Sequence, residues 1–217
     1  MTLLAALQLG DSAFPSGAFT QSYGLETLVA EHAVSNASDV EAVLAAHLRH
    51  RLAAADLPAL LAAHRAAADG DIELVLRINA ALTAIKMTRE ERQASHRMGA
   101  RLMAEARRLA PHPILSASPD NAAVAFALAG LAMGLGTRES AITYGYSFAS
   151  SLVSASMRLL RIGHGEAQGI LRRSHPVIER AVDAAELVPW DAMCPFAPRL
   201  DLAIARHERS PARLFAS

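Results

Sequence analysis

The sequence predicts an all-α protein, a compact single-domain helical bundle of about eight to ten helices. Hydrophobic residues make up 52% of the 217 residues, yet aromatic residues make up only 5%. Alanine, the strongest helix former, is the commonest residue, and few of the β-branched and aromatic residues that favour strands remain. Two Ser/Thr-x-x-Glu capping boxes, at residues 38–41 and 88–91, mark helix starts.

The first half of the chain divides at capping residues and at glycine and proline. Residues 1–21 predict one turn of helix and then an irregular segment that contains Gly10, Pro15 and Gly17. Apolar residues four apart from Val40 to Leu52 give one face of a helix. Pro58 suits the first turn of the next helix, where no N–H is needed. We expect helices over residues 22–31, 38–52, 58–70, 71–84 and 88–109.

In the second half, two uncharged stretches, residues 121–137 and 140–157, raise the question of a membrane. A bilayer span needs about 20 consecutive apolar residues, and the second stretch is rich in serine, so we expect buried core helices and no membrane. Pro176 predicts a break or kink. We expect helices over residues 118–136, 137–162, 165–173 and 177–186, followed by a tail over residues 188–217.

The charge balance excludes one class of partner. Basic and acidic residues number 21 each, whereas a nucleic-acid-binding protein needs a positive surface to neutralise phosphates, so no nucleic-acid partner is expected. One cysteine, Cys194, excludes an intramolecular disulfide and a cysteine-based zinc cluster. The apolar N-terminus lacks a basic start and is interrupted by Asp11, which makes it a poor signal peptide. We expect a cytoplasmic protein.

Catalytic and cofactor motifs are missing, so neither an enzyme nor a cofactor is predicted. The sequence has no P-loop, no G-x-S-x-G elbow, no H-E-x-x-H pair and no G-x-G-x-x-G fingerprint. His47 and His50, three residues apart on a predicted helix, are weak candidates for a nickel or zinc contact, which would make the chain a direct metal carrier. A lone histidine pair without a nearby cysteine or carboxylate triad is more often an ordinary pair of surface side chains. Arg158 could act as an arginine finger on a partner GTPase or could close a helix and hold an interface.

The tail from residue 188 changes character, because prolines recur in it while Trp190, Phe196 and Phe215 are its few bulky apolar residues. Ordering backbone costs about 1–2 kcal/mol per residue, and a buried phenylalanine or leucine returns about 1.5–3 kcal/mol. The tail should therefore be loose unless it docks. The tail has two candidate docking surfaces, one on its own domain and one on a partner protein.

Four separated blocks of the chain together resemble the UreF family of urease accessory proteins. They occur in the family's order, span nearly the whole chain, and are most specific at the two ends. The blocks are residues 7–26, the Glu91-Arg92 pair with Ser95 and Gly99, residues 154–163 with Gln168, and the C-terminal residues 196–217.

The resemblance implies an all-α, non-catalytic adaptor that forms a homodimer. It implies binding to UreD (UreH in some species) and recruitment of the nickel-carrying GTPase UreG to apo-urease for nickel insertion, with both chain ends in contact with partners. The family has also been proposed to form part of an internal route for the metal. Carried over residue by residue, the partner-binding candidates are Phe14, Pro15, Gly17, Phe19, Ser22, Gly24, Glu26, Arg158, Gly163, Gln168, Asp201, His207, Glu208, Arg213, Leu214 and Phe215.

Overall fold

The computed structural model describes residues 2–210 and 213–216, and it confirms the all-α prediction: these residues form helices and connecting segments with no strand. The α-helices are α1 (Thr2–Gly10), α2 (Leu25–Ala30), α3 (Ala37–His47), α4 (Leu57–Ala68), α5 (Ile72–Ile85), α6 (Arg89–Leu109), α7 (Ala122–Ala132), α8 (Thr137–Leu159), α9 (His164–Ala185) and α10 (Pro198–His207). A π-helical segment, η2 (Leu48–Asp56), joins α3 to α4, and short 3-10 turns are η1 (Ala18–Thr20), η3 (Pro113–Ala117) and η4 (Trp190–Ala192).

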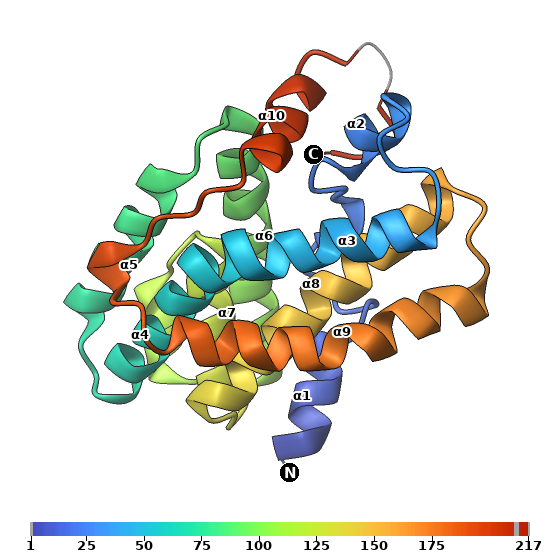
Figure 1. The fold of residues 1–217 in the computed structure, drawn as a ribbon. Coiled ribbons are helices and arrows are strands. Elements are labelled where there is room, and N and C mark those ends of the chain that lie inside the picture. The colour runs from blue at the N-terminus through green and yellow to red at the C-terminus, as the bar shows by residue number, and fades with distance from the viewer. Residues whose placement is uncertain (1, 211–212, 217) are drawn as a thin grey trace.

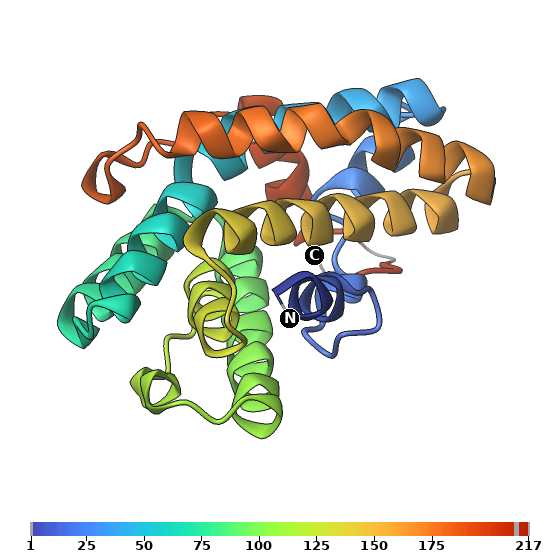
Figure 2. The same ribbon diagram turned by 90° about the horizontal axis from the view of Figure 1, so that it is seen from below.

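The core is built around α7, in which every residue from Ala122 to Gly130 is buried. Helices α4, α6 and α8 pack against it. On its other side α8 packs against α9, and α1 lies beside α8 below this layer (Figures 1 and 2). Both uncharged stretches of the sequence are therefore interior helices. Among the described residues, no helix is long and apolar enough to cross a bilayer.

Helix starts set by local capping agree with the sequence. The Asp71 carboxylate accepts the Leu74 N–H at 2.9 Å, and the Thr88 hydroxyl accepts the Glu91 N–H at 3.1 Å. These caps place α5 and α6 where they were expected, because a capping side chain reaches only its own first turn.

Other boundaries differ from the prediction. In the described residues α1 has nine residues rather than one turn, α2 is shorter than residues 22–31, and α8 ends at Leu159 rather than residue 162. Asn36 caps α3 in place of Ser38, and Asn121 caps α7 in place of Ser118. Asparagine is as good an N-cap as serine, so the sequence offered competing starts a few residues apart.

Two predicted breaks between helices, one at Pro176 and one between residues 52 and 58, were wrong. Pro176 lies inside the continuous helix α9. It is exposed, so water can reach the carbonyl four residues earlier that loses its helical donor. Pro58 lies in the first turn of α4, as expected, but the chain does not leave the helix before it: η2 continues from α3 into α4 with helical backbone angles at both junctions.

Candidate partner-docking surface

The two ends of the chain meet at one end of the molecule, where α2 and α10 lie side by side (Figure 1). After α10 the chain turns back, and the Ala216 N–H bonds to the Thr20 carbonyl at 2.8 Å. The two most specific blocks of the sequence, at opposite ends of the chain, therefore form one surface. We call it the terminal surface and define it by Phe19, Glu26, Arg158, His207, Arg213, Leu214 and Phe215.

An imidazole between two carboxylates ties α10 to both α2 and α6. His207 is 1% exposed; its Nε2 lies 2.9 Å from Glu26 Oε2, and its Nδ1 lies 3.0 Å from Glu90 Oε1. Arg213 adds a cationic group to this cluster, with Nη1 3.3 Å from Glu90 Oε1. Buried charges need such pairing, so this cluster fixes where α10 ends.

Glu208 extends the same connection to the start of α6. Its carboxylate accepts the backbone N–H of Glu90 at 2.7 Å. The first N–H groups of a helix have no partner within the helix, and a negative charge there is favourable. The tail thus supplies part of the N-terminal cap of α6.

Glu26 holds the last residues of the tail directly. One of its oxygens accepts the Leu214 N–H at 2.7 Å, and the other accepts the Phe215 N–H at 3.2 Å. Burial raises the pKa of Glu26, but the hydrogen bonds from Leu214, His207 and Phe215 outweigh burial and lower the pKa below its usual value. The ionised carboxylate is therefore the form that holds the tail.

Arg158, at the end of α8, lies between two aromatic rings contributed by the two ends of the chain. Its guanidinium carbon is 3.9 Å from the centre of the Phe19 ring and 4.3 Å from that of Phe215, and its Nη2 donates to the Phe19 carbonyl at 2.7 Å. Stacked cation–π contacts of this kind suit arginine. In this conformation Arg158 joins the two chain ends, and its Nε also donates to the Ser154 carbonyl at 3.4 Å near the end of α8.

Gly24 allows the close approach of α2 and α10. Its φ is +82°, a left-handed conformation, and a Cβ built on it would lie 3.0 Å from Ile204 Cγ1 and 3.2 Å from the Ile204 nitrogen. Any larger residue would be strained and would also push α10 away. The glycine sits immediately before α2, so its effect falls on the helix that carries Glu26.

In the residues described, the tail packs on its own domain, while its contact with a partner stays a prediction. Phe215 is 4% exposed, so it anchors the tail and is not itself a free apolar contact. Leu214, in contrast, is 62% exposed, and Phe19 is 50% exposed. The energetic argument counted apolar anchors alone, and the hydrogen bonds that join Glu26, Glu90 and His207 also hold the tail in place.

The other candidates lie around or away from this surface. Ser22 is fully buried, and Asp201 on α10 forms an ion pair with Arg51. Gly17, in a left-handed turn, lies against the Arg101 side chain. Phe14 is buried at that turn and Pro15 is exposed, whereas Gly163 and Gln168 are exposed at the start of α9 and take no part in the contacts that join the two chain ends.

The histidine pair does not share a face. His47 is 1% exposed, and its Nε2 lies 3.1 Å from the Tyr23 carbonyl. Burial lowers its pKa to about 3, so the ring is neutral near neutral pH. His50 lies on the following π-helical turn and is exposed. Across the described residues, no group of three His, Cys, Asp or Glu side chains is arranged to hold a metal ion.

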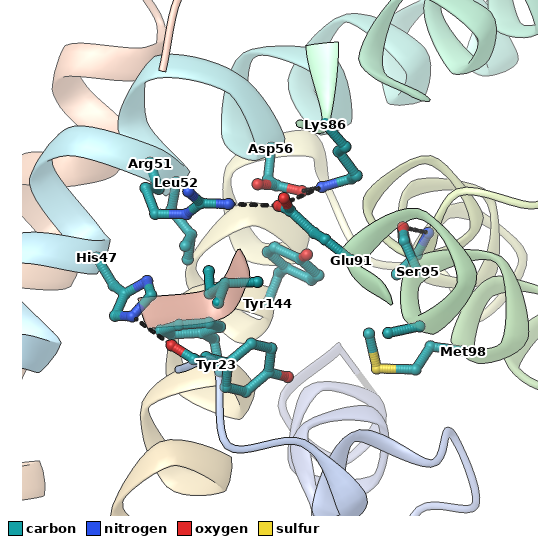
Figure 3. A pocket seen from close by; sticks show the side chains of 14 residues that line it. Tyr23, His47, Arg51, Leu52, Asp56, Lys86, Glu91, Ser95, Met98 and Tyr144 are labelled. Atoms are coloured by element: carbon teal, nitrogen blue, oxygen red, sulfur yellow. Dashed lines mark hydrogen bonds and ion pairs between the residues drawn. The ribbon is translucent and has the colours of Figure 1, made fainter. Parts of the chain in front are cut away.

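A cavity of about 70 Å³ is lined by both charged and apolar side chains, most of them from η2, α6 and α8. Figure 3 shows Arg51, Asp56 and Lys86 gathered around Glu91, with the rings of Tyr23 and Tyr144 below them. Lys86 Nζ is 3.0 Å from Asp56 and 3.7 Å from Glu91, and Arg51 pairs with Glu91 as well as with Asp201.

The cavity's ion pairs connect η2, α6 and α10. Burial lowers the pKa of Lys86, but the charges of Asp56 and Glu91 outweigh burial and raise it, while burial raises the pKa of both Tyr23 and Tyr144. The cations stay charged and the phenols neutral. Sequence reasoning missed this cluster, since its hydrogen bonds join residues 30 to 150 positions apart in the chain and no spacing marks them.

Comparison with known proteins gives one consistent family. The UreF family model matches residues 34–175. A protein of Yersinia enterocolitica serotype O:8 and one of Yersinia pseudotuberculosis serotype I, both named urease accessory protein UreF, are each 31% identical to this chain over 224 residues. A protein of the same name from Yersinia pestis (strain Pestoides F) is 30% identical. Each match covers 99% of this chain and 98% of the relative. The chain therefore belongs to the UreF family of urease accessory proteins.

Proposed function

We propose that this protein is a non-catalytic adaptor in urease maturation, and that the terminal surface is where it binds a UreD-type (UreH-type) partner. Through that complex it recruits the GTPase UreG to apo-urease, so that nickel insertion occurs beside the urease active site. The adaptor works in the cytoplasm as a homodimer. Family membership supports the role in urease maturation; the partner and the surface are our proposal.

One observation carries the choice of surface: the family-typical blocks at the two ends of the chain fold into a single structure. The Glu26 and His207 side chains that join them are 181 residues apart in sequence. The Glu26 and His207 side chains that hold the surface together are paired with each other, and His207 is buried. Leu214, in contrast, is 62% exposed and Phe19 is 50% exposed. Exposed apolar patches rimmed by polar residues mark sites of protein–protein interaction, and Leu214 and Phe19 lie beside the charged groups of Glu26 and Arg158.

An adaptor acts through differential binding. It need only bind one nucleotide state of the GTPase more tightly than the other to couple nucleotide turnover to nickel release. No contact with the phosphates is required, which agrees with the position of Arg158 between two rings of its own chain.

Deletion of residues 210–217 tests the proposal. The truncated protein should keep its helical circular dichroism, because those residues lie outside α1 to α10, and it should no longer co-purify with the UreD-type partner. Co-purification of the truncated protein at the full-length yield would show that partner binding lies elsewhere. Light scattering on the full-length protein counts the subunits.

A further inference from the structure

The segment between α9 and α10, residues 188–197, which we call the strap, crosses the π-helical segment η2 and bonds to its backbone. Figure 1 shows the strap running from beside α5 to α10. The Cys194 N–H bonds to the Ala54 carbonyl at 3.2 Å, and the Phe196 N–H bonds to the His50 carbonyl at 3.2 Å. Both acceptors belong to η2 (Leu48–Asp56).

Pro58 explains why the Ala54 carbonyl of η2 can accept a hydrogen bond from the strap. In an α-helix the Ala54 carbonyl would accept the N–H of residue 58, but proline has no N–H and its ring clashes with that carbonyl. The chain meets this constraint with π-helical turns; the Leu57 N–H bonds to the Leu52 carbonyl, five residues back. Ala54 is half-buried, and the Cys194 N–H bonds to its carbonyl in place of the residue-58 N–H that proline lacks.

The position of η2 decides the position of α10. Arg51 lies on η2 and pairs with Asp201 on α10 and Glu91 on α6. Asp201 also accepts the Ala197 N–H, at 3.3 Å, where the strap passes into α10. The strap and Arg51 therefore hold the same helix that carries His207 into the terminal surface.

The strap is itself lightly held. Leu187, just before it, is 85% exposed, Phe196 is 73% exposed, and Cys194 is exposed. Arg77 lies over the Trp190 ring at 5.5 Å. Trp190, Met193 and Ala197 are the strap residues that pack against the core, and a segment with few buried contacts opens at low free energy.

From this arrangement we propose that the strap is a releasable latch: its backbone hydrogen bonds fix the π-helical register of η2, and its release frees Arg51 and loosens α10. One part of this proposal rests on the proposed function: that release of the latch regulates partner binding at the terminal surface. The coupling between strap and η2 exists in the isolated chain and needs no partner.

The first test is amide hydrogen exchange on the full-length chain alone, comparing Cys194→Pro with Cys194→Ala. Proline removes the N–H that reaches Ala54, whereas alanine keeps it and changes only an exposed side chain. Cys194→Pro should speed exchange in residues 48–57 and in α10 by about fivefold or more, the effect of losing one ordinary hydrogen bond. Cys194→Ala should leave both unchanged. Equal exchange in the two variants would overturn the latch.

A second pair approaches from η2 and covers the case in which Cys194→Pro does not fold. Pro58→Ala gives residue 58 an N–H that competes for the Ala54 carbonyl. Pro176→Ala, at an exposed position inside α9, is the control substitution of a helix proline. The Cys194 amide should exchange faster in Pro58→Ala only, and the emission of Trp190, the single tryptophan, should shift. An unchanged Cys194 amide contradicts the latch. Neither test uses a partner, so a failed latch leaves the docking proposal standing.

Discussion

Glu26 Oε2 and His207 Nε2 lie 2.9 Å apart, although the two residues are 181 positions apart in the chain. The same carboxylate accepts the N–H groups of Leu214 and Phe215. One side chain at the N-terminal end thus orders α10 and the residues after it. The terminal surface depends on that carboxylate.

Replacing Glu26 with glutamine should therefore loosen the tail. The amide keeps the shape but loses the charge, and hydrogen bonds to charged groups are worth about 1.5–3 kcal/mol. We expect the free energy of unfolding to fall by about 2 kcal/mol in urea denaturation, with faster exchange of the Leu214 and Phe215 amides. Glu31→Gln, which removes an exposed pair with Arg206, is the control and should change stability by less than about 0.5 kcal/mol. Equal losses in both variants would show that Glu26 has no special role.

Gly24→Ala should separate α2 from α10. The substitution combines a left-handed backbone with a Cβ 3.0 Å from Ile204. Gly70→Ala provides a matched control, because Gly70 has φ +77° but nothing within 4 Å of the added Cβ. The left-handed strain alone costs about 1–2 kcal/mol, so thermal or urea unfolding should show a larger loss for Gly24→Ala. Only Gly24→Ala should weaken partner binding. Equal behaviour of the two variants would mean that contact with α10 is unimportant.

Arg158→Ala should weaken binding of the UreD-type partner without changing the GTPase chemistry. The substitution removes the guanidinium that lies over both the Phe19 ring and the Phe215 ring. With the complex assembled at saturating concentration, single-turnover GTP hydrolysis by UreG should match that of the wild type. Arg158→Lys keeps the charge but loses the planar stacking, and should also bind weakly. A loss of about 10³-fold or more in the hydrolysis rate would instead identify an arginine finger.

Acidification should destabilise the protein through His47. Burial lowers the pKa of His47 to about 3, against 6.5 for an ordinary histidine. Between these values the unfolded chain binds a proton that the folded chain does not. The free energy of unfolding is therefore highest above about pH 6.5 and decreases as the pH is lowered below that value. One pKa unit corresponds to about 1.4 kcal/mol, so the unfolding free energy from urea titrations should drop by about 2 kcal/mol from pH 7.5 to pH 5.

His47→Gln isolates this contribution. Glutamine can still donate to the Tyr23 carbonyl but does not titrate, so its stability should change less over the same pH range. His64, whose pKa burial also lowers, should account for part of the slope that remains. An equal slope in wild type and variant would show that His47 is not the titrating group.

The sequence predicted those parts of the fold that are set locally. Asp71 and Thr88 cap α5 and α6 within their own first turns, and the uncharged stretch that became α7 had no other place than the interior. Pro58 begins α4 as expected, but the break expected between residues 52 and 58 was wrong, because η2 joins α3 to α4 there and the Cys194 N–H, about 136 residues later, bonds to the Ala54 carbonyl. The cavity cluster was invisible for the same reason: Arg51, Lys86 and Asp201 meet only after folding.

The candidate site was named residue by residue through family resemblance, and the structure explains much of that set. Glu26, Arg158, His207 and Phe215 form one connected group. What the sequence could not give was exposure. Leu214 and Phe215 are neighbours of similar character, yet one is exposed and the other buried.

That difference provides the most direct test of the terminal surface. The affinity of the UreD-type partner is measured by titration calorimetry for the wild type, for Leu214→Asp and for Leu187→Asp, which places the same charge at an exposed leucine away from this surface. We expect Leu214→Asp to weaken binding by about tenfold or more, as a charge in the middle of an apolar contact does, and Leu187→Asp to bind like the wild type. Wild-type affinity in Leu214→Asp would contradict the assignment of partner docking to the joined ends of this chain.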